Sequence, residues 1–313
     1  MRIAVFGAGG AGGYFGGRLA QAGEHVVFIA RGEHLRAIRE HGLRVESVKG
    51  DFEIHPAQAT DNPEDVGEVD AVVVGVKTWQ VAEAALVMRP LVGPRTCVLP
   101  LLNGVEASSQ LEEVLGTGRA LGGLARIFSS IAEPGTIRHT GGPASVAFGE
   151  LDNSPSERTR RLRDAFTRAG VTAEIPADIH VALWEKFLFI TPFGGIGAVT
   201  RAPIGTLRDM PETRRMLERG MREISLVAQT RDIPLSDDTV SKTMAFVDGL
   251  PPGGTASMQR DIIAGRPSEL EAWNGAVVRL GRQAGVPTPL HEFLYHSLLP
   301  LESRARGRLQ FPT

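Results

Sequence analysis

The spacing of hydrophobic residues changes character near residue 176 of this 313-residue chain. Before that point, short apolar runs alternate with stretches of helical period. The runs fall at residues 2–6, 24–30, 70–76, 95–102 and 170–175. Apolar runs of this length are typical of parallel strands buried on both faces. Residues 1–176 are therefore predicted to form a doubly wound α/β domain.

The second part of the chain shows helical periods and no convincing strand. We predict helices near residues 178–190, 212–232, 236–247, 268–284 and 290–304. Ser268 and Glu271 have the spacing of a capping box that would open the fourth of these. An all-helical domain over residues 177–313 is therefore expected to follow the α/β domain.

Two further patterns lie inside the first domain. Residues 43–47 and 51–55 alternate apolar and polar positions around Lys49-Gly50, which predicts a β-hairpin. Short strands are expected at residues 120–131, 135–139 and 144–149, because Pro-Gly and Gly-Gly-Pro interrupt this stretch.

The first apolar run leads directly into a glycine-rich turn, Gly7-Ala8-Gly9-Gly10-Ala11-Gly12, and a helix is expected from Gly13. In this context Gly7 permits a tight turn, Gly9 allows a pyrophosphate to approach the backbone, and Gly12 allows the helix to pack on the strand. The helix N-terminus also favours phosphate. The pattern predicts a Rossmann-type dinucleotide site; the alternative is a glycine-rich turn of another α/β protein.

The end of the second strand bears on the choice of dinucleotide. Arg31 follows this strand, at a position where an arginine accommodates a 2′-phosphate and an acidic residue binds a ribose 2′-hydroxyl. Arg31 favours NADP. Glu33, two residues later, could favour NAD, although it is also suited to open the next helix.

Two more strands end in polar residues at the edge where ligands bind in such sheets. Lys77 follows residues 70–76, and Asn103-Gly104 follows residues 95–102. A solvated lysine and an Asx turn are equally good explanations of these two positions.

Three residues of the helical part carry candidate chemistry. Lys186 begins an apolar helical stretch, and a desolvated lysine can donate a proton to a developing alkoxide, although a snorkelling lysine fits as well. Ser257 follows a Pro-Gly break and could bind a carboxylate or cap a short helix. Glu269 lies in a predicted first helical turn, where an acid also stabilises the dipole.

Composition narrows the classes of function. The formal net charge is −2 without a basic block, which gives no support to nucleic-acid binding. Cys97 is the single cysteine and lies in an apolar run, so an inert buried thiol is expected. The first strand begins at residue 2 and no stretch suits a membrane span, so we expect a cytoplasmic protein without a signal peptide or membrane contact. We assign no metal site.

Taken in order, these residues resemble the ketopantoate reductase (2-dehydropantoate 2-reductase) family over most of the chain. The matching positions are the turn from Gly7 to Gly12, Arg31, Lys77, Asn103-Gly104, Lys186 in Trp184-Glu-Lys186-Phe187, Ser257-Met258, Glu269 and Trp273-Asn274-Gly275. The resemblance implies NADPH-dependent reduction of a 2-keto acid, 2-dehydropantoate to pantoate, in pantothenate biosynthesis.

The resemblance also implies roles for individual residues. Gly7, Gly9, Gly10, Ala11, Gly12, Arg31, Lys77 and Asn103 would bind the cofactor. Lys186 would protonate the ketone oxygen, and Glu269 would act with it or orient the substrate. Ser257 would bind the carboxylate and Asn103 would also contact the substrate.

The chain departs from the family pattern at three positions. Asparagines that hold substrate in the family correspond to Ile190, Gly194 and Ile204 here. Loss of such hydrogen bonds changes which substrate a site accepts. A reductase of a more apolar 2-keto acid is therefore one alternative, and a non-catalytic NADP-binding sensor is another. The oligomeric state stays open, with a homodimer as one candidate.

Overall fold

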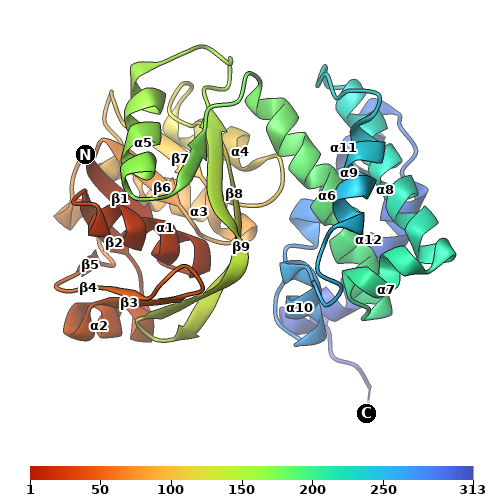
Figure 1. Ribbon diagram of the computed structural model, residues 1–313, viewed down its shortest axis with the longest axis horizontal. Helices are drawn as coiled ribbons and strands as arrows, with labels where there is room; N and C mark the ends of the chain where they lie inside the picture. Colours follow the sequence, from red (N-terminus) through yellow and green to blue (C-terminus); the bar gives the residue numbers. More distant parts are fainter. Residues whose placement is uncertain (313) are drawn as a thin grey trace. The chain divides into compact units, whose positions relative to one another are not determined.

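The computed structural model describes residues 1–312. The chain forms two compact units, Met1–His180 and Val181–Thr313, whose elements are labelled in Figure 1. The sequence placed the domain boundary at residue 176. The contacts divide the chain four residues later, within the first turn of helix α6 (Ile179–Thr200).

The first unit is built on a parallel sheet of five strands in the order β5-β2-β1-β6-β7. These strands are β1 (Arg2–Phe6), β2 (His25–Ile29), β5 (Gln58–Thr60), β6 (Ala71–Val74) and β7 (Cys97–Pro100). The helices α1 (Gly10–Gln21), α2 (Gly32–His41) and α3 (Val81–Val87) lie between them in the chain, and α4 (Ala107–Leu115) follows β7. The strand order reverses between β1 and β6, as in a doubly wound sheet, so the predicted fold class is confirmed. Only the short edge strand β5 was missed.

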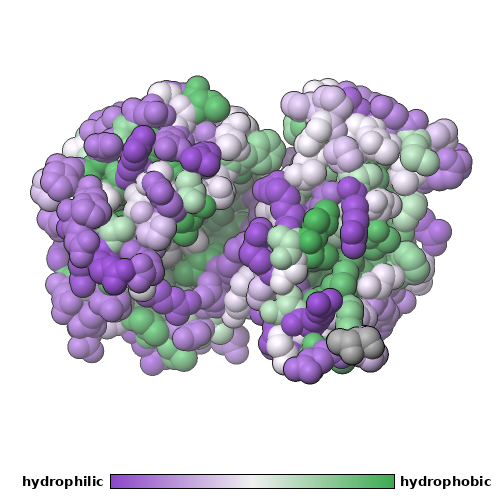
Figure 2. Space-filling view, turned by 90° about the horizontal axis from the view of Figure 1, so that it is seen from below, coloured by the Kyte–Doolittle hydropathy of each residue, from purple (hydrophilic) through white to green (hydrophobic). Residues whose placement is uncertain are grey.

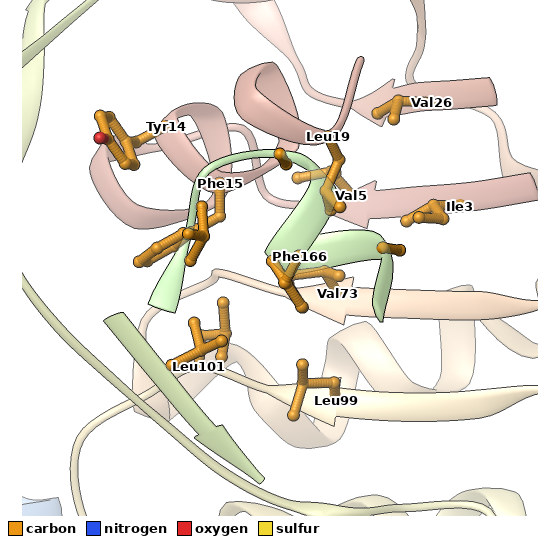
Figure 3. Packing of buried hydrophobic residues seen from close by; sticks show 14 of the residues in the cluster. Ile3, Val5, Tyr14, Phe15, Leu19, Val26, Val73, Leu99, Leu101 and Phe166 are labelled. Atoms are coloured by element: carbon orange, nitrogen blue, oxygen red, sulfur yellow. The ribbon is translucent and has the colours of Figure 1, made fainter. Parts of the chain in front are cut away.

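Alternate residues of each strand face opposite sides of this sheet and enter two separate cores. On one side, Ile3 and Val5 of β1 lie in a buried cluster with Leu19 of α1 and Phe166 of α5 (Glu157–Arg168), as Figure 3 shows. On the other side, residues such as Phe6 pack with α3 and α4. Both faces are therefore covered, which explains the continuous apolar runs in the sequence.

A second sheet in the first unit has the order β10-β9-β3-β4, with β8 paired to β9. Its strands are β3 (Leu43–Ser47), β4 (Phe52–Ile54), β8 (Gly122–Glu133), β9 (Thr136–Gly149) and β10 (Thr172–Glu174). The predicted hairpin is confirmed, since β3 and β4 pair antiparallel.

The prediction of three short strands between residues 120 and 149 was wrong. Figure 1 shows two long curved strands, β8 and β9, there instead. Gly142 and Ala144 take positive φ values of 82° and 50°, and the pairing register shifts between Arg126 and Phe128. Irregularities of this kind bend a strand without ending it, so the glycines and proline did not break the hairpin.

The second unit is helical, as predicted. Besides α6 it contains α7 (Ile204–Asp209), α8 (Pro211–Gln229), α9 (Thr239–Asp248), α10 (Ser257–Ile263), α11 (Ala276–Ala284) and α12 (Pro289–Ala305). The short helix α7 was not predicted, and α10 is the short helix that the sequence offered as one explanation of Ser257. Helix α6 continues through Pro192 to Thr200, ten residues beyond its predicted end, because nearly all of residues 187–198 are buried among other helices. A π-helical turn, Glu271–Gly275, precedes α11.

The predicted capping box of Ser268 and Glu271 was wrong. The Ser268 hydroxyl donates to the buried carboxylate of Glu302, with 2.6 Å between the oxygens, and accepts from the Leu270 N–H. Glu271 instead accepts a hydrogen bond from the Tyr295 hydroxyl at 2.6 Å. The Ser268 N–H, which Glu271 would accept from in a capping box, donates to the charged Glu302 carboxylate instead.

The surface and the single cysteine agree with the composition. Hydrophilic residues cover most of the first unit on the face shown in Figure 2. Cys97 is fully buried in β7, and burial raises the pKa of its thiol to about 12, which makes it the inert thiol expected.

Among residues 1–312, none of the helices has both the length and the apolar character needed to cross a membrane.

Candidate active site

The polar residues selected from the sequence in the first unit lie at the carboxyl ends of four neighbouring strands. Arg31 follows β2, the glycine turn follows β1, Lys77 follows β6 and Asn103 follows β7. Because these strands are parallel and adjacent, the four segments lie side by side along one edge of the sheet. The topological switch point, where ligands bind in open α/β sheets, lies in the middle of this row.

The glycine turn depends on backbone contacts that exclude side chains. Gly7 has a φ of 96°, and its N–H donates to the Ile29 carbonyl at 3.0 Å. A Cβ at Gly12 would collide with the Gly7 carbonyl oxygen, and one at Gly75 would lie 3.0 Å from Gly12 Cα. Helix α1 therefore lies directly against the ends of β1 and β6.

The space beside Gly9 is open. A Cβ added there would have no atom nearer than the Gly75 carbonyl oxygen, at 3.9 Å. Helix α1 begins at Gly10, three residues earlier than predicted, so Gly10, Ala11 and Gly12 form its first turn. N–H groups of a first turn have no partner within their helix. An open backbone followed by these donors fits a dinucleotide pyrophosphate.

Gly10 has a different environment from Gly9. A Cβ at Gly10 would lie 2.6 Å from the carbonyl oxygen of Ser129 in β8. A Cβ at Gly13 would lie 2.7 Å from the Ile137 side chain in β9. These two glycines therefore let the β8–β9 hairpin cover the start of α1.

Arg31 and Glu33 differ in their surroundings at the start of α2. Arg31 is exposed and has extended backbone angles as the N-cap residue of this helix. Glu33 lies in the first helical turn, and its carboxylate pairs with Arg36 on the exposed helix surface. The structure thus gives Glu33 the helix-opening position that the sequence suggested, and leaves Arg31 at the sheet edge.

Lys77 and Asn103 are both half-buried at this edge. The Lys77 ammonium lies 5.8 Å from the centre of the Trp79 ring, and the Lys77 N–H donates to the Gln80 side chain at 3.1 Å. Asn103 precedes Gly104, whose φ of 93° turns the chain toward α4. Both residues are held by turn geometry at the ends of their strands.

One residue at this edge was not singled out from the sequence. His34 Nε2 lies 2.8 Å from the Ala8 carbonyl oxygen of the glycine turn. Its Nδ1 lies 3.0 Å from the Gly135 nitrogen in the turn between β8 and β9. A histidine in an amphipathic helix carries no sequence signal for such contacts, because both partners are backbone atoms of distant segments.

The second unit carries the other candidates, arranged around α6. Lys186 is half-buried in the second turn of this helix, and Ile190 and Gly194 follow on the same helical face. A Cβ at Gly194 would lie 2.7 Å from Trp273 and 3.2 Å from the Met258 methyl. Met258 and Trp273 therefore pack directly against this face of α6.

Met258, next to Ser257, and Trp273, one turn after Glu269, therefore contact α6 at Gly194, about two turns beyond Lys186. Ser257 is the first residue of α10 and precedes Met258; Ala256, not Ser257, is the N-cap. The backbone of Glu269 is tied to Trp273, whose N–H donates to the Glu269 carbonyl at 3.0 Å. Glu269 is buried.

The segment that carries Glu269 is fixed by the partly buried ion pair of Glu302 and Arg306. The Glu302 carboxylate accepts from the Ser268 N–H and hydroxyl, and from Arg306 Nε at 2.6 Å. Arg306 also donates to the Ser268 carbonyl at 2.9 Å. The residue next to Glu269 is thus hydrogen-bonded at its N–H, hydroxyl and carbonyl groups.

Two of the three positions that depart from the family asparagines, Ile204 and Gly194, are closely packed. Ile204 is fully buried, and its N–H donates to the Gly254 carbonyl at 2.9 Å. Gly194 has no space for a side chain beside the Trp273 ring.

Within residues 1–312, no group of three or more His, Cys, Asp or Glu residues is arranged to hold a metal.

A Rossmann-type sheet with a glycine turn at its switch point, followed by a helical unit, defines the class of this protein. The ketopantoate reductase PanE/ApbA family matches residues 3–153, and its C-terminal domain matches residues 178–302. The chain belongs to this family of oxidoreductases.

Similar proteins extend over nearly the whole chain. A 2-dehydropantoate 2-reductase of Halobacterium salinarum is 31% identical over 296 residues, covering 93% of this chain and 95% of the relative. The structure of a PanE/ApbA family ketopantoate reductase from Ralstonia eutropha has a TM-score of 0.89 at 30% identity, covering 98% and 100%. A ternary structure of D-mandelate dehydrogenase with NADH and anilino(oxo)acetate has a TM-score of 0.89 at 25% identity, also covering 98% and 100%.

The two glycines of the turn should respond differently to alanine. Gly12→Ala forces a Cβ onto the Gly7 carbonyl and should lower the midpoint of thermal unfolding by several degrees. Gly9→Ala adds a methyl to open space at a φ of −73°, so stability should be retained. That methyl occupies the space expected for phosphate, so dinucleotide binding should weaken at least tenfold by fluorescence titration. Full affinity in a folded Gly9→Ala protein would contradict this placement.

Proposed function

We propose that this protein reduces a 2-keto acid with NADPH, and that 2-dehydropantoate, reduced to pantoate, is its first candidate substrate. The observation that carries the proposal is the row of Arg31, the glycine turn, Lys77 and Asn103 along one sheet edge. The family and the Halobacterium salinarum relative support the reaction. NADH in the D-mandelate dehydrogenase structure supports a nicotinamide cofactor.

The first unit would hold the cofactor. The open backbone at Gly9 and the N–H groups of Gly10 to Gly12 would bind the pyrophosphate. The exposed Arg31 guanidinium would bind the 2′-phosphate, which favours NADPH over NADH. When bound, a nicotinamide supplies the hydride. Lys77 and Asn103 would position its reactive end.

The second unit would bind the substrate carboxylate and donate a proton to the ketone oxygen. As hydride reaches the keto carbon, negative charge develops on the ketone oxygen, and the Lys186 ammonium would donate a proton to it. The half-burial of Lys186 strengthens this interaction, because less water screens the charge. Ser257 would bind the carboxylate, and Glu269 would orient the substrate or Lys186.

A second candidate is a 2-keto acid with a more apolar side chain. The Trp273 ring fills the space that a side chain at position 194 would need, and Ile190 adds a branched apolar group one turn closer to Lys186. The residues at positions 190 and 194 therefore offer no side-chain hydrogen bond to a substrate hydroxyl, which favours a substrate with an apolar group. D-mandelate, whose dehydrogenase has a similar fold, carries a phenyl ring on the carbon next to its carboxylate.

A panel of 2-keto acids tests the function directly. Purified protein should oxidise NADPH, followed at 340 nm, with 2-dehydropantoate or with aliphatic and aromatic 2-keto acids. The kcat/KM values rank the two candidates, and a higher value for phenylglyoxylate or a branched-chain keto acid would favour the second. Absence of oxidation with every keto acid would contradict the proposal and leave a non-catalytic NADPH-binding protein.

The role of Lys186 can be separated from cofactor binding. Lys186→Ala should lower kcat by ~10² or more, because the developing alkoxide loses its proton donor. The dissociation constant of NADPH should change little. Lys242→Ala, at an exposed lysine of α9, is the matched control and should retain wild-type turnover. Near-normal kcat in Lys186→Ala would exclude the assigned role.

Arg31 should determine the preference between cofactors. Arg31→Ala should weaken NADPH about tenfold or more and NADH much less, because only NADPH carries the 2′-phosphate. Titration of tryptophan fluorescence with each nucleotide measures both constants. Arg36→Ala, at an exposed arginine of the same helix, should leave them unchanged. Equal losses for the two nucleotides in Arg31→Ala would refute the assignment.

A further inference from the structure

His34 connects three segments of the first unit that are far apart in the sequence. It lies in the first turn of α2, three residues after Arg31, and is half-buried. One ring nitrogen contacts the glycine turn at Ala8, and the other contacts the β8–β9 turn at Gly135.

The two partners fix the protonation state of the ring. A carbonyl oxygen only accepts, so Nε2, 2.8 Å from the Ala8 oxygen, must carry the hydrogen. A backbone N–H only donates, so Nδ1, which receives the Gly135 N–H at 3.0 Å, must present its lone pair. The imidazole is therefore neutral and is the Nε2–H tautomer. Burial lowers the pKa of His34, in the direction that favours this form, although the Ala8 bond opposes it.

Each of the contacted segments also packs near the proposed cofactor site. The Ala8 carbonyl lies between Gly7 and Gly9 of the glycine turn. The hairpin that contains Gly135 packs on Gly10 through Ser129 and on Gly13 through Ile137. A Cβ at Gly135 would lie 3.0 Å from Ala37 of α2, so the hairpin turn also packs on the helix that begins after Arg31.

We propose that His34 is a cofactor-positioning residue, which holds the start of α2, with Arg31, at a fixed distance from the glycine turn. This inference rests on the proposed function, since it assigns the pyrophosphate to the turn and the 2′-phosphate to Arg31. The pyrophosphate and the 2′-phosphate of NADPH are attached to the same adenosine ribose, which restricts the distance between them. A site that binds both therefore gains affinity when their partners are held in place before binding.

The two hydrogen bonds can be tested separately, because different side chains replace different ring nitrogens. The side-chain nitrogen of Gln reaches as far as Nε2 and can donate to Ala8, while the oxygen of Asn reaches as far as Nδ1 and can accept from Gly135. His34→Gln thus retains the bond to the glycine turn, and His34→Asn retains only the bond to the hairpin. His34→Ala removes both. His41→Gln, at an exposed histidine of the same helix, is the matched control.

The dissociation constants of NADPH and NADH are measured by fluorescence titration, together with KM and kcat and the midpoint of thermal unfolding. His34→Asn and His34→Ala should weaken NADPH binding about tenfold, because both variants lack the hydrogen bond to the glycine turn. Their KM for NADPH should rise while kcat stays within about threefold, and their preference for NADPH over NADH should fall. His34→Gln and His41→Gln should bind within about threefold of wild type.

Several results would overturn the inference. One is a folded His34→Asn or His34→Ala protein with wild-type affinity for NADPH. Another is a His34→Gln protein as weak as His34→Ala. Failure of both the Asn and Ala variants to fold would show that the ring supports the fold instead. A wild-type protein that binds no nicotinamide nucleotide would overturn the proposed function as well, whereas one that binds NADPH but reduces no keto acid would contradict the proposed reaction alone.

Discussion

In both units, helices pack closely on neighbouring segments at glycine positions, where a side chain would collide with the neighbouring atoms. In the first unit, Gly12 of α1 approaches the Gly7 carbonyl so closely that no side chain fits. In the second unit, Gly194 of α6 is covered by Trp273, and Gly197 by the side chain of Gln259. Each contact lets one helix or strand lie directly on another. These close contacts fix the backbone segments that carry the candidate functional residues.

The consequences differ between the two units. In the first, close packing of α1 on the strand ends leaves the helix N-terminus and the open backbone at Gly9 facing the sheet edge. In the second, α10 and the π-helical turn pack on α6 at Gly194 and Gly197, beyond the turn that carries Lys186. The first arrangement is suited to phosphate. The second fixes the segments that carry Ser257 and Glu269 against the helix that carries Lys186.

The fold and the order of the site residues were predictable because their signals are local. The apolar runs identified four of the five strands of the parallel sheet, and the residues that follow these four strands marked its edge. Errors arose where distant groups decide the local structure. The Ser268 N–H donates to Glu302 instead of Glu271, and the β8–β9 pairing continues across Gly141 and Gly142. His34 was missed for the same reason, since its partners are the backbones of Ala8 and Gly135.

We propose that the glycine turn and Arg31 together bind one NADPH molecule. A crystal structure of the intact protein with NADPH tests it most directly. The pyrophosphate is predicted within hydrogen-bonding distance of the N–H groups at the start of α1, with the 2′-phosphate on the Arg31 guanidinium. A nucleotide bound elsewhere, or a 2′-phosphate without contact to Arg31, would contradict the account.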